Sequence, residues 1–218
     1  MKKIKIAPSI LSADFARLGE EIRDITNAGA DVIHLDVMDG SFVKNISFGP
    51  KMIKEVRFYS NAIFDAHLMI VKPWNYIKQF AEAGADIITV HYEACGDRLK
   101  QTLLEIKELG VKCGVVINPD TPAEKIADVV ELCDMILLMS VFPGFGGQKF
   151  IPDVVPKIKE VADLVAKSGK EIDIEIDGGI TKDNVKLCKD AGANVIVAGS
   201  TVFGAPDRAL IIKELREI

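Results

Sequence analysis

The sequence predicts a single-domain (β/α)₈ barrel, first of all because one short pattern recurs along the chain. The pattern occurs in NAGADVIHLDV, EAGADIITVHY and DAGANVIVAGS. In each, a helical pattern ends at Ala-Gly-Ala and a run rich in β-branched residues begins. Glycine just past a helix end adopts the left-handed cap conformation at little steric cost. Gly29 and Gly84 are 55 residues apart, and Gly84 and Gly192 are 108 apart, about two such steps. This spacing indicates repeated βα units.

The second observation is a set of eight short apolar runs with helical patterns between them. Most lack alternation, as expected of parallel strands that are covered on both faces. One helix start, Thr121-Pro122-Ala123-Glu124, combines a capping threonine, a proline at the first helical position and a capping-box glutamate. The predicted strands lie near residues 4–9, 32–38, 62–69, 87–91, 112–117, 135–139, 172–177 and 195–198.

The third observation is that no linker or change in composition divides residues 1–218, which we therefore interpret as one domain. Eight alternations in 218 residues fit a small (β/α)₈ barrel. A doubly wound open sheet is the alternative, but its G-x-G-x-x-G signature does not follow the first predicted strand.

Composition excludes several classes of protein. The net charge is -5 and basic residues are interspersed with acidic ones, which argues against a nucleic-acid partner. No apolar stretch approaches the ~20 residues of a membrane span. The opening MKKIKIAPSILSADF is interrupted by Lys5 and Pro8 and does not fit an export signal. The four cysteines are far apart and predict reduced thiols in a cytoplasmic protein.

Polar residues recur at the carboxyl ends of the predicted strands, where a barrel carries its active site. His34 and Asp36 are two residues apart and project to one face of a strand, and His67 and Asp177 can converge on them from other strands. Two imidazoles and two carboxylates suit one divalent ion, Zn²⁺, Fe²⁺, Mn²⁺ or Co²⁺. A single strand histidine is more often a core residue, but that explanation weakens when four such groups coincide. For His91, the remaining histidine, we favour the role of a hydrogen-bonded core residue.

Three glycine-rich loops follow the last three predicted strands. Glycines leave backbone N–H groups unobstructed, and barrels often bind phosphate at these loops, although any single pair could be a tight turn. Met38, Met69 and Met139 end predicted strands and are either core filler or an apolar floor under a bound sugar. The loops contain Gly144, Gly146 and Gly147, then Gly178 and Gly179, then Gly199 and Ser200.

Taken in order, these motifs closely resemble the ribulose-phosphate 3-epimerase family of ribulose-phosphate-binding barrels. The resemblance covers essentially the whole chain, and the ordered set is far more specific than any one fragment. The matching stretches are PSILSADF at 8–15, HLDVMDGSFVKN at 34–45, SFGP at 47–50, HLM at 67–69, PGFGGQKF at 143–150, DGGI at 177–180 and AGS at 198–200.

The resemblance implies a cytoplasmic, homo-oligomeric enzyme of the pentose phosphate pathway with one divalent metal ion per subunit. It implies metal ligation by His34, Asp36, His67 and Asp177, with Asp36 and Asp177 also serving as the acid/base residues. It places the substrate, a small sugar phosphate, against Ser9, His67, Gly144, Phe145, Gly146, Gly147, Gly178, Gly179, Gly199 and Ser200.

The expected reaction interconverts D-ribulose 5-phosphate and D-xylulose 5-phosphate, and the residues suit it independently. Inverting a carbon beside a ketone removes a proton from one face and returns one to the other, which takes two acid/base groups. A metal stabilises the negative charge of the 2,3-enediolate intermediate. Asp36 and Asp177 are expected to exchange roles with reaction direction. Asp39, out of step with that face, is expected to organise the following loop.

The chain departs from the family pattern in four places. Lys44 replaces the proline of FVPN, and Phe142 precedes PGFGG where a polar residue is usual. Ala66 stands where valine is common, and Thr201 where alanine is. These changes bear on loop closure, turnover and substrate preference, and none removes a proposed ligand.

Two other functions fit the same motifs. An allulose-6-phosphate 3-epimerase would share the metal and the aspartates, and a non-catalytic sugar-phosphate binder would keep only the loops. Because Asp36 and Asp177 are both present, the binder is the weaker alternative. Sister barrels that decarboxylate or condense sugar phosphates use D-x-K-x-x-D, and Met38 takes the place of that lysine. No predicted strand ends in the lysine of a Schiff-base aldolase.

Overall fold

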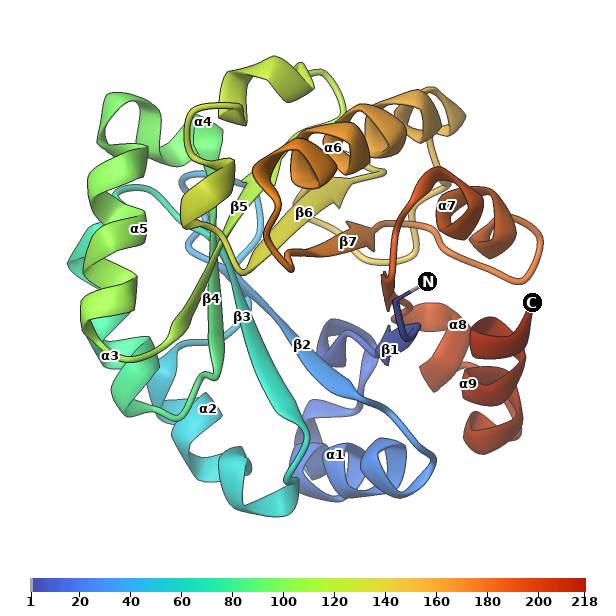
Figure 1. Ribbon diagram of the computed structural model, residues 1–218. Coiled ribbons are helices and arrows are strands. Elements are labelled where there is room, and N and C mark those ends of the chain that lie inside the picture. The colour runs from blue at the N-terminus through green and yellow to red at the C-terminus, as the bar shows by residue number, and fades with distance from the viewer. Residues whose placement is uncertain (1) are drawn as a thin grey trace.

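The computed structural model, which describes residues 2–218, is a barrel of eight parallel strands inside a ring of helices (Figure 1). From β3 to β8, each strand pairs with the one before it in the chain, and β8 also pairs with β1. The strands are β1 (Lys5–Ala7), β2 (Val32–Met38), β3 (Ile63–Met69), β4 (Ile87–His91), β5 (Lys112–Ile117), β6 (Met135–Met139), β7 (Asp173–Asp177) and β8 (Val195–Val197).

The barrel closes between β1 and β2. The backbone N–H of Asp31 donates to the carbonyl of Ile6 at 3.0 Å, and that of His34 to Pro8 at 3.1 Å. A parallel bridge also joins Ser9 to His34. The (β/α)₈ prediction is confirmed, and the open sheet is wrong.

The helices cover the outside of the barrel through their apolar faces. Ile22 and Ile25 of α1 and Leu103 and Ile106 of α5 are fully buried against the strands. None of the helices within residues 2–218 has the length and apolar character needed to cross a bilayer. The helices are α1 (Leu18–Asn27), α2 (Pro50–Val56), α3 (Ile77–Glu82), α4 (Tyr92–Cys95), α5 (Leu99–Glu108), α6 (Val155–Ser168), α7 (Val185–Ala191), α8 (Ser200–Phe203) and α9 (Arg208–Glu217).

The connection between β5 and β6 differs from the prediction. It contains two 3₁₀ helices, Ala123–Ile126 and Val130–Leu132, and the predicted capping box does not form. Pro122 occupies the cap position, and the Thr121 hydroxyl instead donates to the carboxylate of Glu93, just after β4. The hydroxyl that the local sequence pattern assigns to a helix cap therefore donates a hydrogen bond to a residue from an earlier part of the chain.

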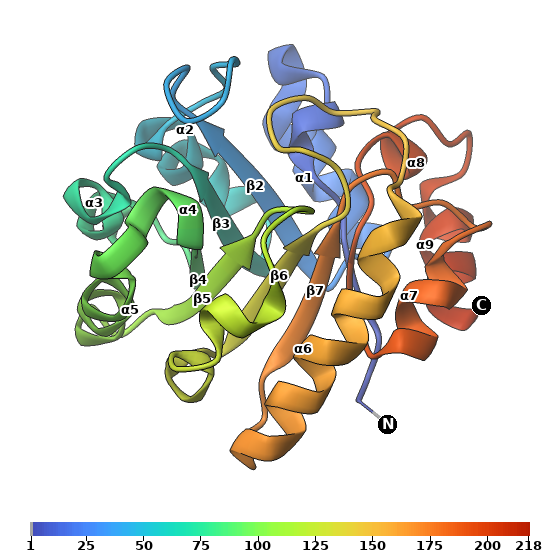
Figure 2. The same cartoon turned by 90° about the horizontal axis from the view of Figure 1, so that it is seen from above.

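The barrel interior is apolar at one end and polar at the other. An apolar cluster inside the barrel contains the first residues of four strands, Val32, Ile87, Met135 and Val195, together with Ala7 and Val197, the last residues of β1 and β8. Alternate residues further along the same strands also face inward, because side chains two apart share a face. The loops that follow β2 and β6 lie together at the opposite end (Figure 2).

Candidate active site

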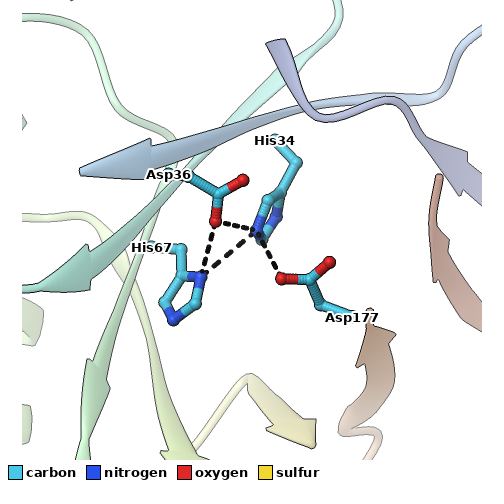
Figure 3. A group of neighbouring side chains, drawn as sticks. All are labelled: His34, Asp36, His67 and Asp177. Carbon is cyan, nitrogen blue, oxygen red and sulfur yellow. Dashed lines mark hydrogen bonds and ion pairs between the residues drawn. The ribbon is translucent and has the colours of Figure 1, made fainter. Parts of the chain in front are cut away.

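Four ionisable side chains meet inside the polar end of the barrel (Figure 3). β2 contributes His34 and Asp36, β3 contributes His67, and β7 contributes Asp177. His34 Nε2 lies 3.3 Å from both His67 Nδ1 and Asp36 Oδ1, and 3.9 Å from Asp177 Oδ2. His67 Nδ1 and Asp36 Oδ1 are 3.0 Å apart. The sequence analysis predicted this grouping, and the structure brings all four residues together.

The spacing of these atoms fits the ligands of a single metal ion. Metal–ligand bonds of about 2.0–2.1 Å place the corners of a tetrahedron about 3.3–3.4 Å apart. The three pairwise distances between His34 Nε2, Asp36 Oδ1 and His67 Nδ1 are 3.0–3.3 Å. When Asp177 is included, one ligand atom from each of the four residues lies within 4.8 Å of the others. Mixed nitrogen and oxygen ligation suits a divalent transition metal or Zn²⁺.

His34 is held from behind by carboxylates that the sequence analysis missed. Its Nδ1 lies 2.8 Å from Asp65 Oδ2 and 3.5 Å from Glu175 Oε1, and both of these residues are fully buried. An Nδ1–H that donates to Asp65 leaves Nε2 facing the cluster. Asp65 precedes His67 by two residues, as Glu175 precedes Asp177, so the same-face rule could have found them.

The electrostatics of the cluster favour a positive charge at its centre. Burial lowers the pKa of His34, but the carboxylates of Asp36 and Glu175 outweigh this effect and raise it well above its usual value. Burial raises the pKa of Asp36, yet the charge of His34 and the hydrogen bond that His34 donates hold it far below its usual range. Without a metal, a proton on His34 supplies the positive charge, and a divalent cation fits the same donor set.

Asp177 differs from Asp36 in its protonation. Burial, and then the negative charge of Asp36, raise the pKa of Asp177 to about 6. Two carboxylates whose pKa values are pushed apart in this way can serve as one base and one acid. The Ser9 hydroxyl also donates to Asp36 Oδ2, which favours the ionised form of Asp36.

An open cavity of about 540 Å³ lies above the cluster and reaches the rim loops. Asp36 and Asp177 line it, whereas His34 and His67 are not among its lining residues. The other predicted substrate residues line this cavity: Ser9, Met38, Met69, Met139, Gly144, Phe145, Gly146, Gly147, Gly178, Gly179, Gly199 and Ser200. Ser12 and Gln148, which the sequence analysis did not predict at the site, also line it, as does Thr201, one of the four departures from the family pattern.

The glycines of the last two loops are required by close packing. A Cβ on Gly178, whose φ is +129°, would lie 2.6 Å from Val141 Cγ2, and one on Gly199 would lie 2.7 Å from Ser12 Oγ. Within residues 2–218, the backbone N–H groups of Gly146, Gly147, Gly179 and Ser200 donate to no acceptor. Unoccupied N–H groups around one cavity can bind an anion.

The loop after β2 is built as predicted around Asp39. Its Oδ1 accepts from the backbone N–H groups of Ser41 and Phe42, and its Oδ2 accepts from Val71, each at 2.8 Å. Further along the loop, the Asn45 side chain donates to the Gly144 carbonyl at 2.8 Å and joins this loop to the one after β6.

Three of the four departures from the family pattern lie outside the cavity. Lys44 and Phe142 line a separate surface groove, and Phe142 is exposed. Ala66 points away from the barrel interior, because it lies between the inward-facing Asp65 and His67.

His91 is fully buried, as expected of a core residue, but both of its ring nitrogens contact ionisable side chains. Its Nε2 lies 2.9 Å from His67 Nε2, and its Nδ1 lies 3.1 Å from Glu93 Oε2. Burial lowers the pKa of His91 to about 4, so its imidazole is neutral near pH 7.

Fold and site together define a (β/α)₈-barrel enzyme with two opposed carboxylates and a glycine-lined cavity at the carboxyl ends of its strands. A profile of the ribulose-phosphate 3 epimerase family matches residues 5–203, and the chain belongs to that family. It is 55% identical to ribulose-phosphate 3-epimerase of Bacillus subtilis over 214 residues, which cover 98% of each chain. It is 48% identical to the Escherichia coli enzyme of the same name over 217 residues, 99% of this chain and 96% of the other.

Among solved structures, 3-keto-L-gulonate-6-phosphate decarboxylase from Vibrio cholerae aligns with a TM-score of 0.75 at 17% identity. The alignment covers 100% of this chain and 97% of the other. At that identity the match shows a shared barrel fold.

Proposed function

We propose that this enzyme interconverts D-ribulose 5-phosphate and D-xylulose 5-phosphate by inverting C3. The observation that carries the proposal is a pair of carboxylates, Asp36 and Asp177, that line one cavity with oppositely shifted pKa values. Relatives at 55% and 48% identity that bear the name ribulose-phosphate 3-epimerase support this substrate. The whole barrel serves as the catalytic domain.

Asp36 and Asp177 exchange the proton at C3 from opposite faces of the sugar. The ionised carboxylate removes the proton from one face, and the protonated one returns a proton to the other. Asp36 begins as the base in the metal-free charge distribution, because its charge is stabilised by His34 and Ser9. In the reverse direction, the two residues exchange roles.

His34, Asp36, His67 and Asp177 hold one divalent cation in this proposal. When bound, the cation supplies positive charge that stabilises the enediolate oxygens. His34 and His67 lie behind the two aspartates and leave the cavity to the substrate. Met38, Met69 and Met139 form its apolar floor and exclude water from the reacting carbon.

The phosphate binds to the backbone N–H groups of the three glycine-rich loops. No lysine or arginine lines the cavity within residues 2–218, so peptide dipoles carry the recognition. Gly146, Gly147, Gly179 and Ser200, whose N–H groups donate to no acceptor within residues 2–218, line the cavity from the loops after β6, β7 and β8. This arrangement binds a dianion without placing a competing cation beside the metal ligands.

The test follows D-ribulose 5-phosphate by NMR in D₂O, before and after the protein is treated with a chelator. We expect deuterium at C3 and formation of xylulose 5-phosphate, both lost on chelation and restored by a divalent metal. Asp177→Asn should lose exchange while still binding a sugar phosphate.

Exchange that persists after complete metal removal would contradict the cofactor assignment alone. No exchange from folded, metal-loaded protein would overturn the pentose substrate. Exchange with allulose 6-phosphate in that case would assign the six-carbon substrate, and binding without exchange would assign the non-catalytic function.

A further inference from the structure

A line of hydrogen-bonding groups runs away from the proposed metal site behind His67. His67 Nδ1 faces Asp36, and its Nε2 lies 2.9 Å from His91 Nε2. His91 Nδ1 in turn lies 3.1 Å from Glu93 Oε2. The function described above uses neither His91 nor Glu93, although β4 and the turn after it bring both to the site.

The contact between the two rings restricts where their hydrogens lie. Two Nε2 atoms at 2.9 Å cannot both carry a hydrogen, so one ring donates and the other accepts. If His91 accepts, its hydrogen lies on Nδ1 and donates to Glu93. His67 then carries its hydrogen on Nε2, and its Nδ1 can accept from His34 Nε2, 3.3 Å away. If His67 accepts, His91 turns the lone pair of its Nδ1 toward the Glu93 carboxylate, which is a repulsive contact.

Glu93 is held as an acceptor by other groups. The backbone N–H of Asn118 donates to its Oε1 at 2.8 Å, and the Thr121 hydroxyl donates to the same atom. Oε2 is thereby left for His91. The Phe42 ring packs on His91 with centroids 4.8 Å apart, so water has little access to the contact.

We propose that His91 and Glu93 are positioning residues that fix His67 in its Nε2–H tautomer, so that the lone pair of Nδ1 faces the metal site. The proposal rests on the metal site of the proposed function. A metal-ligating histidine needs such a partner on its other nitrogen, and here the partner is a second imidazole backed by a carboxylate. The Thr121 hydroxyl is a second donor to Glu93 Oε1, which the Asn118 N–H already holds as an acceptor.

Glu93→Gln tests the proposal by reversing the hydrogens with little change in shape. The Asn118 N–H requires an acceptor at the Oε1 position, so the amide NH₂ must face His91 Nδ1. His91 then donates from Nε2 to His67, and His67 carries its hydrogen on Nδ1, where the metal must bind. Loss of such an outer partner typically weakens metal affinity by about 10–100-fold.

The matched control is Thr121→Val, which removes a hydrogen bond to the same carboxylate but presents no new donor to His91. Co²⁺ is titrated into metal-free protein against a competing chelator and followed by its visible absorption. We expect Glu93→Gln to bind Co²⁺ about 10–100-fold more weakly than the wild type, and Thr121→Val to bind it as the wild type does.

A second measurement reads the tautomer directly and needs no variant. With only three histidines in the chain, ¹⁵N NMR of metal-free protein above neutral pH resolves each imidazole. We expect His67 as the Nε2–H tautomer in the wild type and as the Nδ1–H tautomer in Glu93→Gln.

The outcomes separate this inference from the proposed function. Wild-type protein that binds Co²⁺ while His67 shows the Nδ1–H tautomer overturns the inference alone, as does unchanged affinity in Glu93→Gln. Equal weakening in Thr121→Val would assign the effect to loop damage and overturn it as well. Wild-type protein that binds no divalent metal overturns the proposed cofactor and this role together.

Discussion

Replacing Asp177 with asparagine should change how the stability of the metal-free protein depends on pH. The carboxyl side chain is 15% exposed, and its pKa is raised from 3.8 to about 6 by burial and by the charge of Asp36. Between these two values the folded protein keeps a proton that the unfolded chain has lost. The free energy of unfolding therefore falls as the pH rises from about 4 to about 6 and stays low above that.

The size of this fall follows from the two pKa values. A tenfold change in proton affinity is worth about 1.4 kcal/mol, so Asp177 accounts for at most about 3 kcal/mol. His34 also makes the free energy of unfolding fall, but at higher pH. The pKa of His34 is raised in the folded protein, so its contribution to stability is lost as the pH rises through that raised pKa. His34 remains in Asp177→Asn, so the difference between the two proteins isolates Asp177 and its coupling to His34.

The assay is urea-induced unfolding of chelator-treated wild type and Asp177→Asn at intervals from about pH 4 to about pH 8. The wild type should lose stability between about pH 4 and about pH 6, and the variant should lose about 3 kcal/mol less over that range. With divalent metal present, the wild-type trend should weaken or reverse, because ligands bind metal in their deprotonated forms. Parallel curves for the two metal-free proteins would refute the assignment of a raised pKa to Asp177.

Three other substitutions test separate parts of the site. Asp36→Asn should lower the rate of C3 exchange by about 10²–10⁴-fold, as removal of an acid/base group does, while circular dichroism shows a folded barrel. Gly179→Ala should cost about 1–3 kcal/mol in unfolding free energy and raise KM for the sugar phosphate, because φ is +63° and the new Cβ would collide with the Phe150 nitrogen. Asn45→Ala removes the hydrogen bond to the Gly144 carbonyl and should lower kcat/KM by about 2–10-fold, the worth of one hydrogen bond, with Tm unchanged. A fall in Tm with kcat/KM unchanged would instead make that contact purely structural.

The sequence predicted the strands well where an apolar run is bounded by polar or glycine residues. The predicted bounds of β2, β4, β5 and β6 coincide with the structure. The four-residue cluster was also predictable, because strand order and the two-residue period bring His34, Asp36, His67 and Asp177 to one end of one interior.

What the sequence could not show are contacts between groups that no local pattern relates. Thr121 satisfies every local rule for a helix cap, yet its hydroxyl donates to Glu93, 28 residues earlier in the chain. From the sequence alone, His91 is best interpreted as a core histidine. Its contact with His67 becomes apparent only in the structure. In both cases the partner is set by the pairing of neighbouring strands, which fixes distances that spacing along the chain leaves open.

The buried layer beneath the site explains how one barrel interior can accept either protons or a metal ion. Burial and the charge of Asp65 raise the pKa of Glu175 well above its usual value, so Glu175 holds a proton more tightly than a solvated carboxyl does. Without metal, the Asp36 carboxylate faces a protonated His34 and, below about pH 6, a protonated Asp177. Exchanging the protons on His34 and Asp177 for one divalent cation leaves the net charge of the cluster unchanged. Because burying additional charge is costly, this equality lets the ion enter with no compensating change elsewhere in the core.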